Sequence, residues 1–493
     1  FLFPQFINSS NLGFSTQIPY FKVIDIDKDI TISPRVYTNN NLFIQTEYRQ
    51  ANKNSNFITD FSYNKKDKIN SHFFSNLIGE KDDSFYELKI ETVSGDNYIK
   101  KYQIQSPLIK NDTILNSSLQ FEKLDQDYTF STSVNIYEDL SKTKNDKYEY
   151  SLPEYKFVKE TYLNNSIFDT LSFRSSGNYR KFETNIDEAD ISNELVFKSS
   201  NYSQLKNFNS NFNLLFRNIN SYGDLSNTYK DGKDYKLLSS ALYNLKYPLI
   251  KKSENTINYL TPIASFRFSP NKGLNLQNEV TTMNFESLFG LDRFNEKTIE
   301  SGGSATLGFE FKSNNNLNQE KLNLGLAVNL RNKIDEDLPI SSSLGQKTSD
   351  IIGYSGINIT ENLSLNYNFI IDQNLKDTNY NLISLDYNND KLQTSFEYFE
   401  KSNTVGDESY LKNFTKLEIN KTNSISFETN KNIDKNLTDY YNLIYKYKND
   451  CLEASVVYNK QFYNDDGINS SKNIFFKLSF LPFGTISSPT VND

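Results

Sequence analysis

The sequence predicts a single all-β domain, a large transmembrane antiparallel β-barrel of about 26 strands. Three observations lead to this fold class. Apolar and polar residues alternate with period two along most of the chain, as in strands with one apolar face. The strand-like segments are about ten residues long, the length that a tilted strand needs to cross a bilayer. Hydrophobic residues make up only 37% of the 493 residues although aromatic residues reach 14%, which agrees with a wet lumen inside a lipid-facing wall.

The alternation is clearest in four segments, which are residues 128–136, 322–330, 363–369 and 392–398. Their apolar faces carry Tyr128, Tyr367 and Tyr398, and tyrosine is typical of membrane interfaces. Helical spacing is rare, and the best candidate for a helix is the short segment from Asp187 to Leu195. Polar links join the strands, for example Lys142–Lys147, Ser313–Glu320 and Tyr463–Lys472.

The number of strands favours closure into a barrel. A soluble sandwich does not use so many strands, whereas a closed barrel removes the exposed edges of a large sheet. A soluble repeat protein, such as a propeller or an adhesin stalk, is the alternative. Such proteins show glycine- or aspartate-centred repeats at a fixed period, and the sequence has none.

The first fifty residues predict two or three strands that open the sheet. These strands are Phe1–Asn8, Gly13–Ile24 and Asp29–Tyr37, the last running on to Arg49. Pro4 and Pro19 each fall inside one of the first two. Proline has no N–H for a strand ladder and belongs at an edge or a bulge. The prolines therefore predict a weak seam between the first and last strands.

Charge and residue counts exclude several classes of function. The net charge is −8 and no long run of Lys or Arg is present, so nucleic acid is not expected as a partner. The single histidine, His72, lies in a loop-like stretch, and a Ser-His-Asp site would have to use it. The carboxylate pairs Asp82-Asp83 and Asp465-Asp466 lie in polar links. We therefore expect no enzyme activity, no cofactor and no metal site.

Cys451 is the only cysteine and directly precedes a predicted strand near the end of the chain. Three states are open to it on the residues alone. It is a disulfide partner of a cysteine outside this chain, a free thiol, or an ordinary buried thiol.

Short motifs along the chain resemble the C-terminal barrel of the LptD family, also called lipopolysaccharide-assembly or organic solvent tolerance proteins. The motifs are Phe3-Pro4, Gly13-Phe14, Pro19-Tyr20-Phe21, Asp29 to Pro34, Glu47-Tyr48-Arg49, Val93 to Tyr98, Leu152-Pro153-Glu154, Leu260-Thr261-Pro262 and Leu288 to Phe294. The resemblance rests on their order and spacing from residue 1 to residue 484. Asn295 to Thr298 departs from the Gly-x-Asp-Arg that the family carries there, which puts the role of that loop in doubt.

The resemblance implies an outer-membrane barrel over residues 1–484 with a C-terminal tail at 485–493. It implies that an N-terminal periplasmic jellyroll domain is missing from this chain, and that Cys451 forms a disulfide with a cysteine of that domain. Pro4 and Pro19 would mark a lateral gate. The last strand, Ile474 to Phe480, is similar to the family's signal for the barrel-assembly machinery.

The function implied by the resemblance is a translocon that inserts lipopolysaccharide into the outer leaflet through the barrel lumen and the lateral gate. The implied partners are lipopolysaccharide, a plug resembling the lipoprotein LptE, and a periplasmic bridge of the LptA type that binds the missing domain. A passive porin or a gated nutrient receptor is the alternative. The sequence upstream of Phe1 separates the two, because a receptor has a plug domain there and a translocon has a jellyroll.

Overall fold

The computed structural model describes most of the chain. The described residues are 5–9, 12–38, 41–66, 68–102, 104–142, 144–163, 167–201, 207–271, 273–294, 298–402, 407–434, 437–461, 471–480 and 484–487.

Strands dominate the fold. They are β1 (Gln5–Ser9), β2 (Gly13–Gln17), β3 (Tyr20–Asp25), β4 (Lys28–Tyr37), β5 (Leu42–Ala51), β6 (Ser55–Lys66), β7 (Lys68–Lys81), β8 (Ser84–Val93), β9 (Ile114–Leu124), β10 (Tyr128–Asp139), β11 (Tyr148–Tyr162), β12 (Phe168–Phe182), β13 (Ile186–Ser199), β14 (Asn209–Asp224), β15 (Gly232–Lys246), β16 (Leu249–Lys252), β17 (Thr256–Ser269), β18 (Gly302–Asn315), β19 (Glu320–Arg331), β20 (Ile351–Thr360), β21 (Leu363–Ile371), β22 (Thr378–Asn388), β23 (Leu392–Lys401), β24 (Glu408–Glu418), β25 (Asn423–Asn432), β26 (Leu437–Lys448), β27 (Leu452–Gln461), β28 (Ser471–Phe480) and β29 (Gly484–Ser487). The helical segments are α1 (Tyr98–Tyr102), η1 (Lys144–Lys147), α2 (Phe285–Leu288) and η2 (Ile340–Ser342). No helix within the described residues has the length and apolarity needed to span a membrane.

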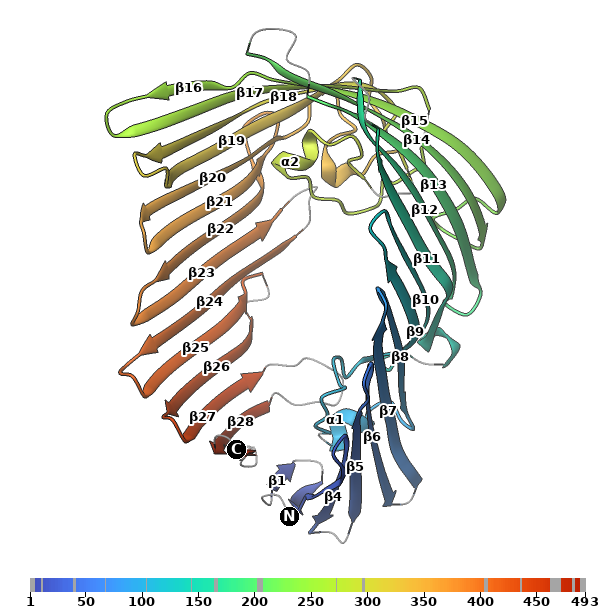
Figure 1. Cartoon of the computed structure of the whole chain (residues 1–493), viewed down its shortest axis with the longest axis vertical. Helices are drawn as coiled ribbons and strands as arrows, with labels where there is room; N and C mark the ends of the chain where they lie inside the picture. The colour runs from blue at the N-terminus through green and yellow to red at the C-terminus, as the bar shows by residue number, and fades with distance from the viewer. Residues whose placement is uncertain are drawn as a thin grey trace.

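The strands form one antiparallel sheet that curves around a central opening, with both ends of the chain at the same side (Figure 1). Two strands are interrupted at a proline. β2 and β3 both pair with β4 on either side of Pro19, and β15 and β16 both pair with β17 on either side of Pro248. With each interrupted strand counted once and the short β29 set aside, the sheet has 26 strands, as the sequence predicts. The all-β fold class is confirmed.

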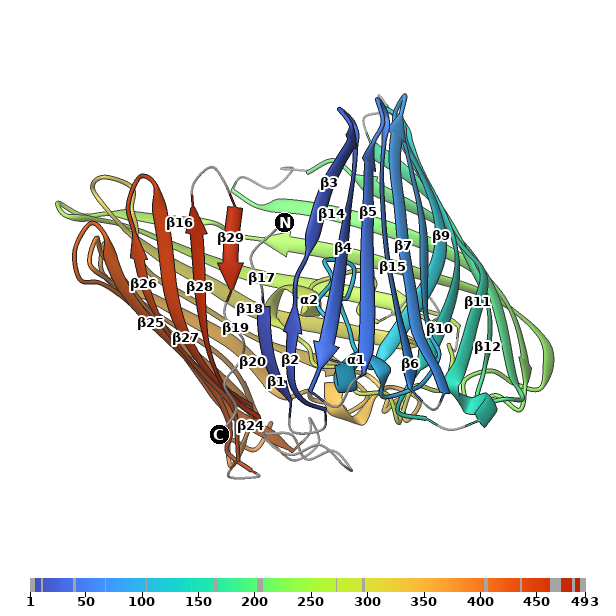
Figure 2. The same cartoon turned by 90° about the horizontal axis from the view of Figure 1, so that it is seen from below.

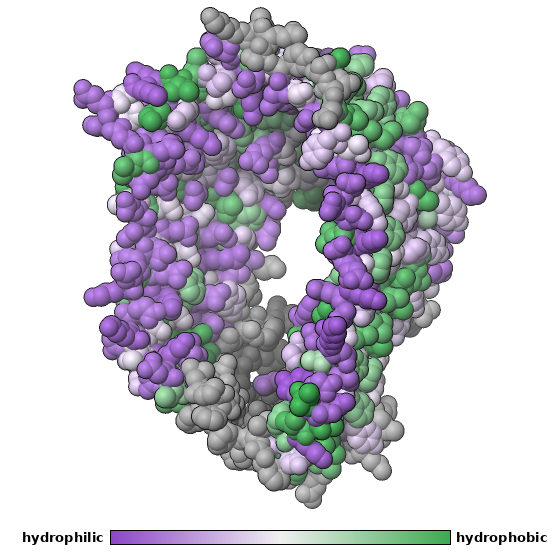
Figure 3. All heavy atoms as spheres, viewed as in Figure 1, coloured by the Kyte–Doolittle hydropathy of each residue, from purple (hydrophilic) through white to green (hydrophobic). Residues whose placement is uncertain are grey.

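The two faces of the wall differ because side chains alternate along each strand. On β17 to β19, Phe309 and Leu326 share one face, while Arg267, Ser304 and Arg331 share the other. The second face points into the lumen, because the side chains of Arg267, Ser304 and Arg331 contact segments folded inside the barrel. Hydrophilic residues line much of the opening, and hydrophobic residues gather on the outer side of the wall on the right (Figure 3).

The two ends of the barrel carry different connections. One end, which we call the short-turn end, has tight turns such as those at Ile26-Asp27 and Asp82-Asp83. The other, the long-loop end, carries the connections 94–113, 270–301 and 332–350. Outer-membrane barrels have short periplasmic turns and longer extracellular loops. The lengths of the connections therefore distinguish the two ends of the barrel.

The hydrophobic core lies where the long connections fold back onto the inner wall. Connection 94–113 packs Tyr98, Ile99 and Tyr102 against Phe43 and Phe74 of the wall. Connections 270–301 and 332–350 pack together and against the wall, and their buried residues include Met283, Phe285, Leu288, Leu338 and Leu344. In Figure 1, α2 lies within the outline of the sheet and α1 lies beside β6 and β7.

Four local expectations were wrong. The segment Asp187–Leu195 lies in β13 and not in a helix, and His72 lies in β7 and not in a loop. Leu152-Pro153-Glu154 resembles a motif that starts a strand in the family, but here it sits inside β11 at a shift of register. The stretch from Asp29 to Arg49 is two strands, β4 and β5. In the first case, the polar residues Asp187 and Asn193 interrupt the apolar outward row. In the second, three polar residues in succession, Asn70 to His72, hide the alternation.

Candidate functional site

The first and last strands face each other across a seam (Figure 2). β1 pairs with β2, and β29 pairs with β28. Within the described residues, no pairing joins these two edges, although every other pair of neighbours along the wall is hydrogen-bonded. β29 covers the edge of β28 only from Lys477 to Phe480.

Pro19 lies next to the seam, in the break between β2 and β3. It is buried, and the backbone N–H of the preceding Ile18 donates to the carbonyl of Pro34 on β4 at 3.1 Å. Neither Pro19 nor Pro34 has an N–H to donate. The missing N–H of Pro34 leaves the ladder between the edge strand and β4 one donor short. Because successive N–H groups of a strand point to opposite sides, the missing N–H of Pro19 lies on the side of the seam. Pro4 lies outside the described residues.

Connection 94–113 is held against the wall beside the seam by tyrosines of α1. The hydroxyl of Tyr98 lies 2.8 Å from Ser62 Oγ, and the hydroxyl of Tyr102 donates to Asn64 Oδ1 at 3.3 Å. The Tyr102 ring stacks on Phe43 with centroids 5.7 Å apart. Burial raises the pKa of the Tyr98 phenol above its ordinary value, so the phenol stays protonated and able to donate.

Ser62, His72 and Asp60 form a buried chain of polar contacts on β6 and β7. Ser62 Oγ lies 2.5 Å from His72 Nδ1, and Asp60 Oδ1 lies 3.2 Å from His72 Nε2. These are the residue types of an acyl-transfer triad. Ser62 and Asp60 are both 0% exposed, and the Tyr98 hydroxyl covers the serine oxygen. The chain of contacts fastens connection 94–113 to the wall and offers no route for a substrate.

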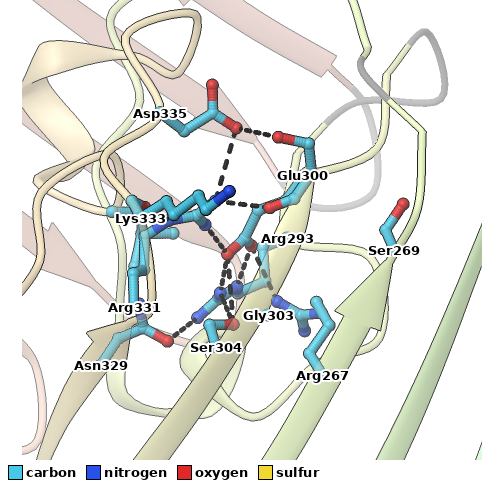
Figure 4. A network of polar contacts seen from close by, with 12 residues as sticks. Arg267, Ser269, Arg293, Glu300, Gly303, Ser304, Asn329, Arg331, Lys333 and Asp335 are labelled. Atoms are coloured by element: carbon cyan, nitrogen blue, oxygen red, sulfur yellow. Dashed lines mark hydrogen bonds and ion pairs between the residues drawn. The ribbon is translucent and has the colours of Figure 1, made fainter.

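A second polar cluster fastens connections 270–301 and 332–350 near the long-loop end (Figure 4). At its centre Glu300 accepts hydrogen bonds from Arg267 Nη1 at 2.8 Å and from Arg293 Nε at 2.7 Å. Arg331 also pairs with Glu300, and its Nη2 lies 3.4 Å from Asp335. Two of these arginines come from strands, and Arg293 comes from the connection. The cluster therefore ties the inward-folded segment to the wall.

The charges in this cluster shift each other's titration. Burial opposes ionisation of Glu300, but the charges of Arg293, Arg267 and Arg331 outweigh it and lower the pKa of Glu300 to about 2. Burial, together with the like charge of Arg267, lowers the pKa of Arg293 to about 10. Glu300 and Arg293 therefore both stay charged at neutral pH.

Arg217 on β14 makes a third attachment. Its Nε donates to Glu194 Oε2 at 2.9 Å, its Nη2 donates to Asp292 Oδ2 at 2.5 Å, and its Nη1 donates to the carbonyl of Thr298 at 2.7 Å. Asp292 and Thr298 belong to connection 270–301. No local pattern in the sequence indicates this network or the Glu300 cluster, because their members are far apart in the chain.

Cys451 is exposed and free in the turn between β26 and β27, at the short-turn end. Its backbone N–H donates to Asn449 Oδ1 at 3.0 Å. This position excludes the buried thiol that the sequence left open.

Comparison with known proteins decides the family. A family model described as LPS transport system D, LptD, matches residues 56–437. The chain belongs to the LptD family. The LPS-assembly protein LptD of Pseudoalteromonas atlantica (strain T6c) is 31% identical to it over 105 residues, a stretch that covers 20% of this chain and 14% of that protein. The resemblance found in the sequence is confirmed.

Proposed function

We propose that this chain is the barrel of a translocon that inserts lipopolysaccharide into the outer leaflet of the outer membrane. Lipopolysaccharide enters the lumen from the short-turn end and leaves sideways through the seam between β1–β3 and β28–β29. Membership of the LptD family supports the substrate. The unpaired edges at the seam, within the described residues, are the observation that carries the exit route.

The chemistry of the substrate explains why a seam serves better than a pore. Each methylene of an acyl chain that is exposed to water costs about 0.8 kcal/mol. A lateral exit keeps the acyl chains in lipid while the sugars move through a polar lumen. Connections 94–113, 270–301 and 332–350 pack against the luminal wall at the long-loop end, and a central opening remains beside them (Figure 3).

A cleavable cross-link across the seam tests the proposal. Ile7→Cys on β1 and Ile474→Cys on β28, joined by a cleavable bis-maleimide, should stop the appearance of new lipopolysaccharide at the cell surface. Cleavage of the linker should restore it. The matched control is Val456→Cys with Phe476→Cys, a directly paired position on β27 and β28, which should have no effect when joined. Each single variant controls for reaction at Cys451.

Unchanged surface lipopolysaccharide with the seam joined would exclude the lateral route. If joining the seam instead altered only the uptake of small solutes, the passive porin or gated nutrient receptor would be the better description. Neither alternative has an observation in its favour among the described residues.

We also propose that the short-turn end faces the periplasm and that Cys451 forms a disulfide with a cysteine of an N-terminal domain outside this chain. The exposed thiol at that end supports the pairing. Non-reducing electrophoresis of the protein, cleaved between the domain and the barrel, should show the two parts linked. Cys451→Ser should separate them, and Asn449→Ser, in the same turn, should not.

The remaining partners of the proposal follow from the family. They are a lipoprotein plug resembling LptE in the lumen, a periplasmic bridge of the LptA type on the N-terminal domain, and the barrel-assembly machinery, which would bind the strand that contains Ile474 to Phe480. Photo-cross-linkers placed on the luminal face of β23 and β24, at Glu397 and Lys412, would detect the plug. The outer-facing Leu411 is the matched control position.

A further inference from the structure

A small pocket opens on the luminal wall directly behind the seam. Its volume is about 180 Å³, and its walls come from the edge strand, β4, β5 and connection 94–113. Pro19, Ser33, Arg35, Glu47 and Gln105 line it. Pockets for drug-sized ligands measure roughly 300–1,000 Å³. This pocket therefore has room for one small group and not for an oligosaccharide.

Arg35 brings a buried positive charge to this pocket. Its side chain is anchored by neutral groups. Nε donates to Gln17 Oε1 at 2.7 Å, Nη1 donates to the carbonyl of Tyr102 at 2.6 Å, and the Phe43 ring centroid lies 4.9 Å from the guanidinium carbon. No carboxylate oxygen of the described residues lies within 4.0 Å of the guanidinium nitrogens, and Nη2 makes no hydrogen bond to a described residue.

The absence of a counter-charge sets Arg35 apart from the other buried arginines of the described residues. Each of the others pairs with a carboxylate, Arg217 with Glu194 and Asp292, and Arg267, Arg293 and Arg331 with Glu300. Arg35 is only 2% exposed. Burying an unpaired charge is costly, and neutral hydrogen-bond partners leave the local charge positive. The pocket therefore has the electrostatics of a site that awaits an anion.

We propose that this pocket binds one oxyanion, a phosphate or a carboxylate, carried by the sugar part of the molecule that passes through the lumen. The inference rests on the proposed function, which supplies a sugar-bearing substrate. A guanidinium binds oxyanions through charge-assisted hydrogen bonds, which are stronger than neutral ones, and Nη2 is available to make one. Glu47, which also lines the pocket, accepts hydrogen bonds from sugar hydroxyl groups and repels a second anion.

The position of the pocket gives the binding a consequence. Pro19 belongs to the edge strand of the seam, and Gln105 and the Tyr102 carbonyl belong to connection 94–113. A bound oxyanion would therefore lie between the edge strand of the seam and connection 94–113. We assign the pocket the role of holding the charged sugar at the seam before release.

The experiment neutralises Arg35 without removing it. Ser33 lies on the same face of β4 two residues away, so Ser33→Asp places a carboxylate beside the guanidinium, and Ser33→Asn is the uncharged control of equal size. A photo-cross-linker at Thr31, which also lines the pocket, reports contact with lipopolysaccharide in the full protein in cells. A second cross-linker at Phe14, on the outer face of β2, reports lipopolysaccharide at the exit.

Ser33→Asp should lower cross-linking at Thr31 about tenfold relative to Ser33→Asn, because an internal carboxylate occupies Arg35. Equal cross-linking in the two variants would overturn the anion site. If the protein without a Ser33 substitution formed no cross-link to lipopolysaccharide at either Thr31 or Phe14, the proposed function would be overturned instead. Arg35→Gln should reproduce the effect of Ser33→Asp, and heat-modifiable migration on gels checks that each variant folds.

The chemical source of the oxyanion is separable with the same reporter. Lipopolysaccharide stripped of phosphate and lipopolysaccharide with its carboxylates reduced are supplied in turn to the purified full-length protein. A fall in cross-linking with the first assigns the site to a phosphate, and a fall with the second assigns it to a carboxylate. Undiminished cross-linking with both substrates would overturn the proposal.

Discussion

Arg35 Nη1 donates to the backbone carbonyl of Tyr102 at 2.6 Å and so joins β4 at the seam to connection 94–113, 67 positions further along the chain. Two further contacts hold the same connection. The Tyr98 hydroxyl contacts Ser62 on β6, and the Tyr102 ring stacks on the Phe43 ring. Connection 94–113 is thus fastened to β4, which pairs with the edge strands β2 and β3 of the seam.

Tyr98→Phe removes the hydroxyl that contacts Ser62 and keeps the ring. We expect opening of connection 94–113 to become easier by about 1 kcal/mol, or roughly fivefold in the opening equilibrium. Hydrogen exchange of residues 98–102 measures this. Tyr179→Phe, which removes the bond to Asp187 at 3.0 Å on another part of the wall, should leave exchange in the connection unchanged. Equal exchange in the two variants would show that the contact with Ser62 contributes nothing.

Glu300→Gln leaves Arg267, Arg293 and Arg331 without the carboxylate that they share. Removing one partner of a buried ion pair destabilises the folded state by about 3–5 kcal/mol. Connection 270–301 should therefore detach from the wall. We expect a larger and more variable conductance in planar bilayers and faster entry of a bulky antibiotic. Glu254→Gln, in a short turn, is the control. A conductance equal to that of the unmodified protein would mean that the Glu300 cluster does not hold connection 270–301 against the wall.

Acid should release the same connection. The pKa of Glu300 is lowered to about 2 from its ordinary 4.5, although burial opposes this, because three arginines favour the carboxylate. A group whose pKa is lower in the folded state stabilises that state fully above the unfolded pKa, and the stabilisation is lost as pH falls through the folded pKa. Cleavage of residues 285–294 by pepsin should therefore rise between pH 4.5 and pH 2. In Glu300→Gln, cleavage should already be high at pH 4.5, and a flat profile in the unmodified protein would refute the assignment.

Pro4→Ala combined with Pro19→Ala should tighten the seam. Each restored N–H can add a ladder hydrogen bond, worth about 1 kcal/mol net, and delivery of lipopolysaccharide to the surface should slow. Pulse labelling of new surface lipopolysaccharide measures the rate. Pro248→Ala is the matched control, because Pro248 interrupts a strand on the opposite side of the barrel (Figure 1). An unchanged rate in the double variant would count against the gate.

The sequence predicted the wall correctly, because a barrel strand has a lipid-facing side on which every second residue is apolar. Segments such as 322–330 therefore show their structure directly. The prediction failed where that signal is weak. In 187–195, Asp187 and Asn193 stand in the outward row with Ile191 and Leu195, and they interrupt the apolar face. His72 follows Asn70 and Ser71, and three polar residues in succession concealed the strand there.

The sequence by itself determined the fold class, the strand number, the family and the prolines near the first strands, because these follow from local pattern and motif order. Only the tertiary structure decided what fills the lumen. The Glu300 cluster joins residues from two strands and two connections, and an arginine in a polar sequence looks the same whether or not a carboxylate lies beside it. Arg35 lacks such a partner among the described residues because Gln17, Tyr102 and Phe43 surround it instead, and that difference exists only once the chain has folded.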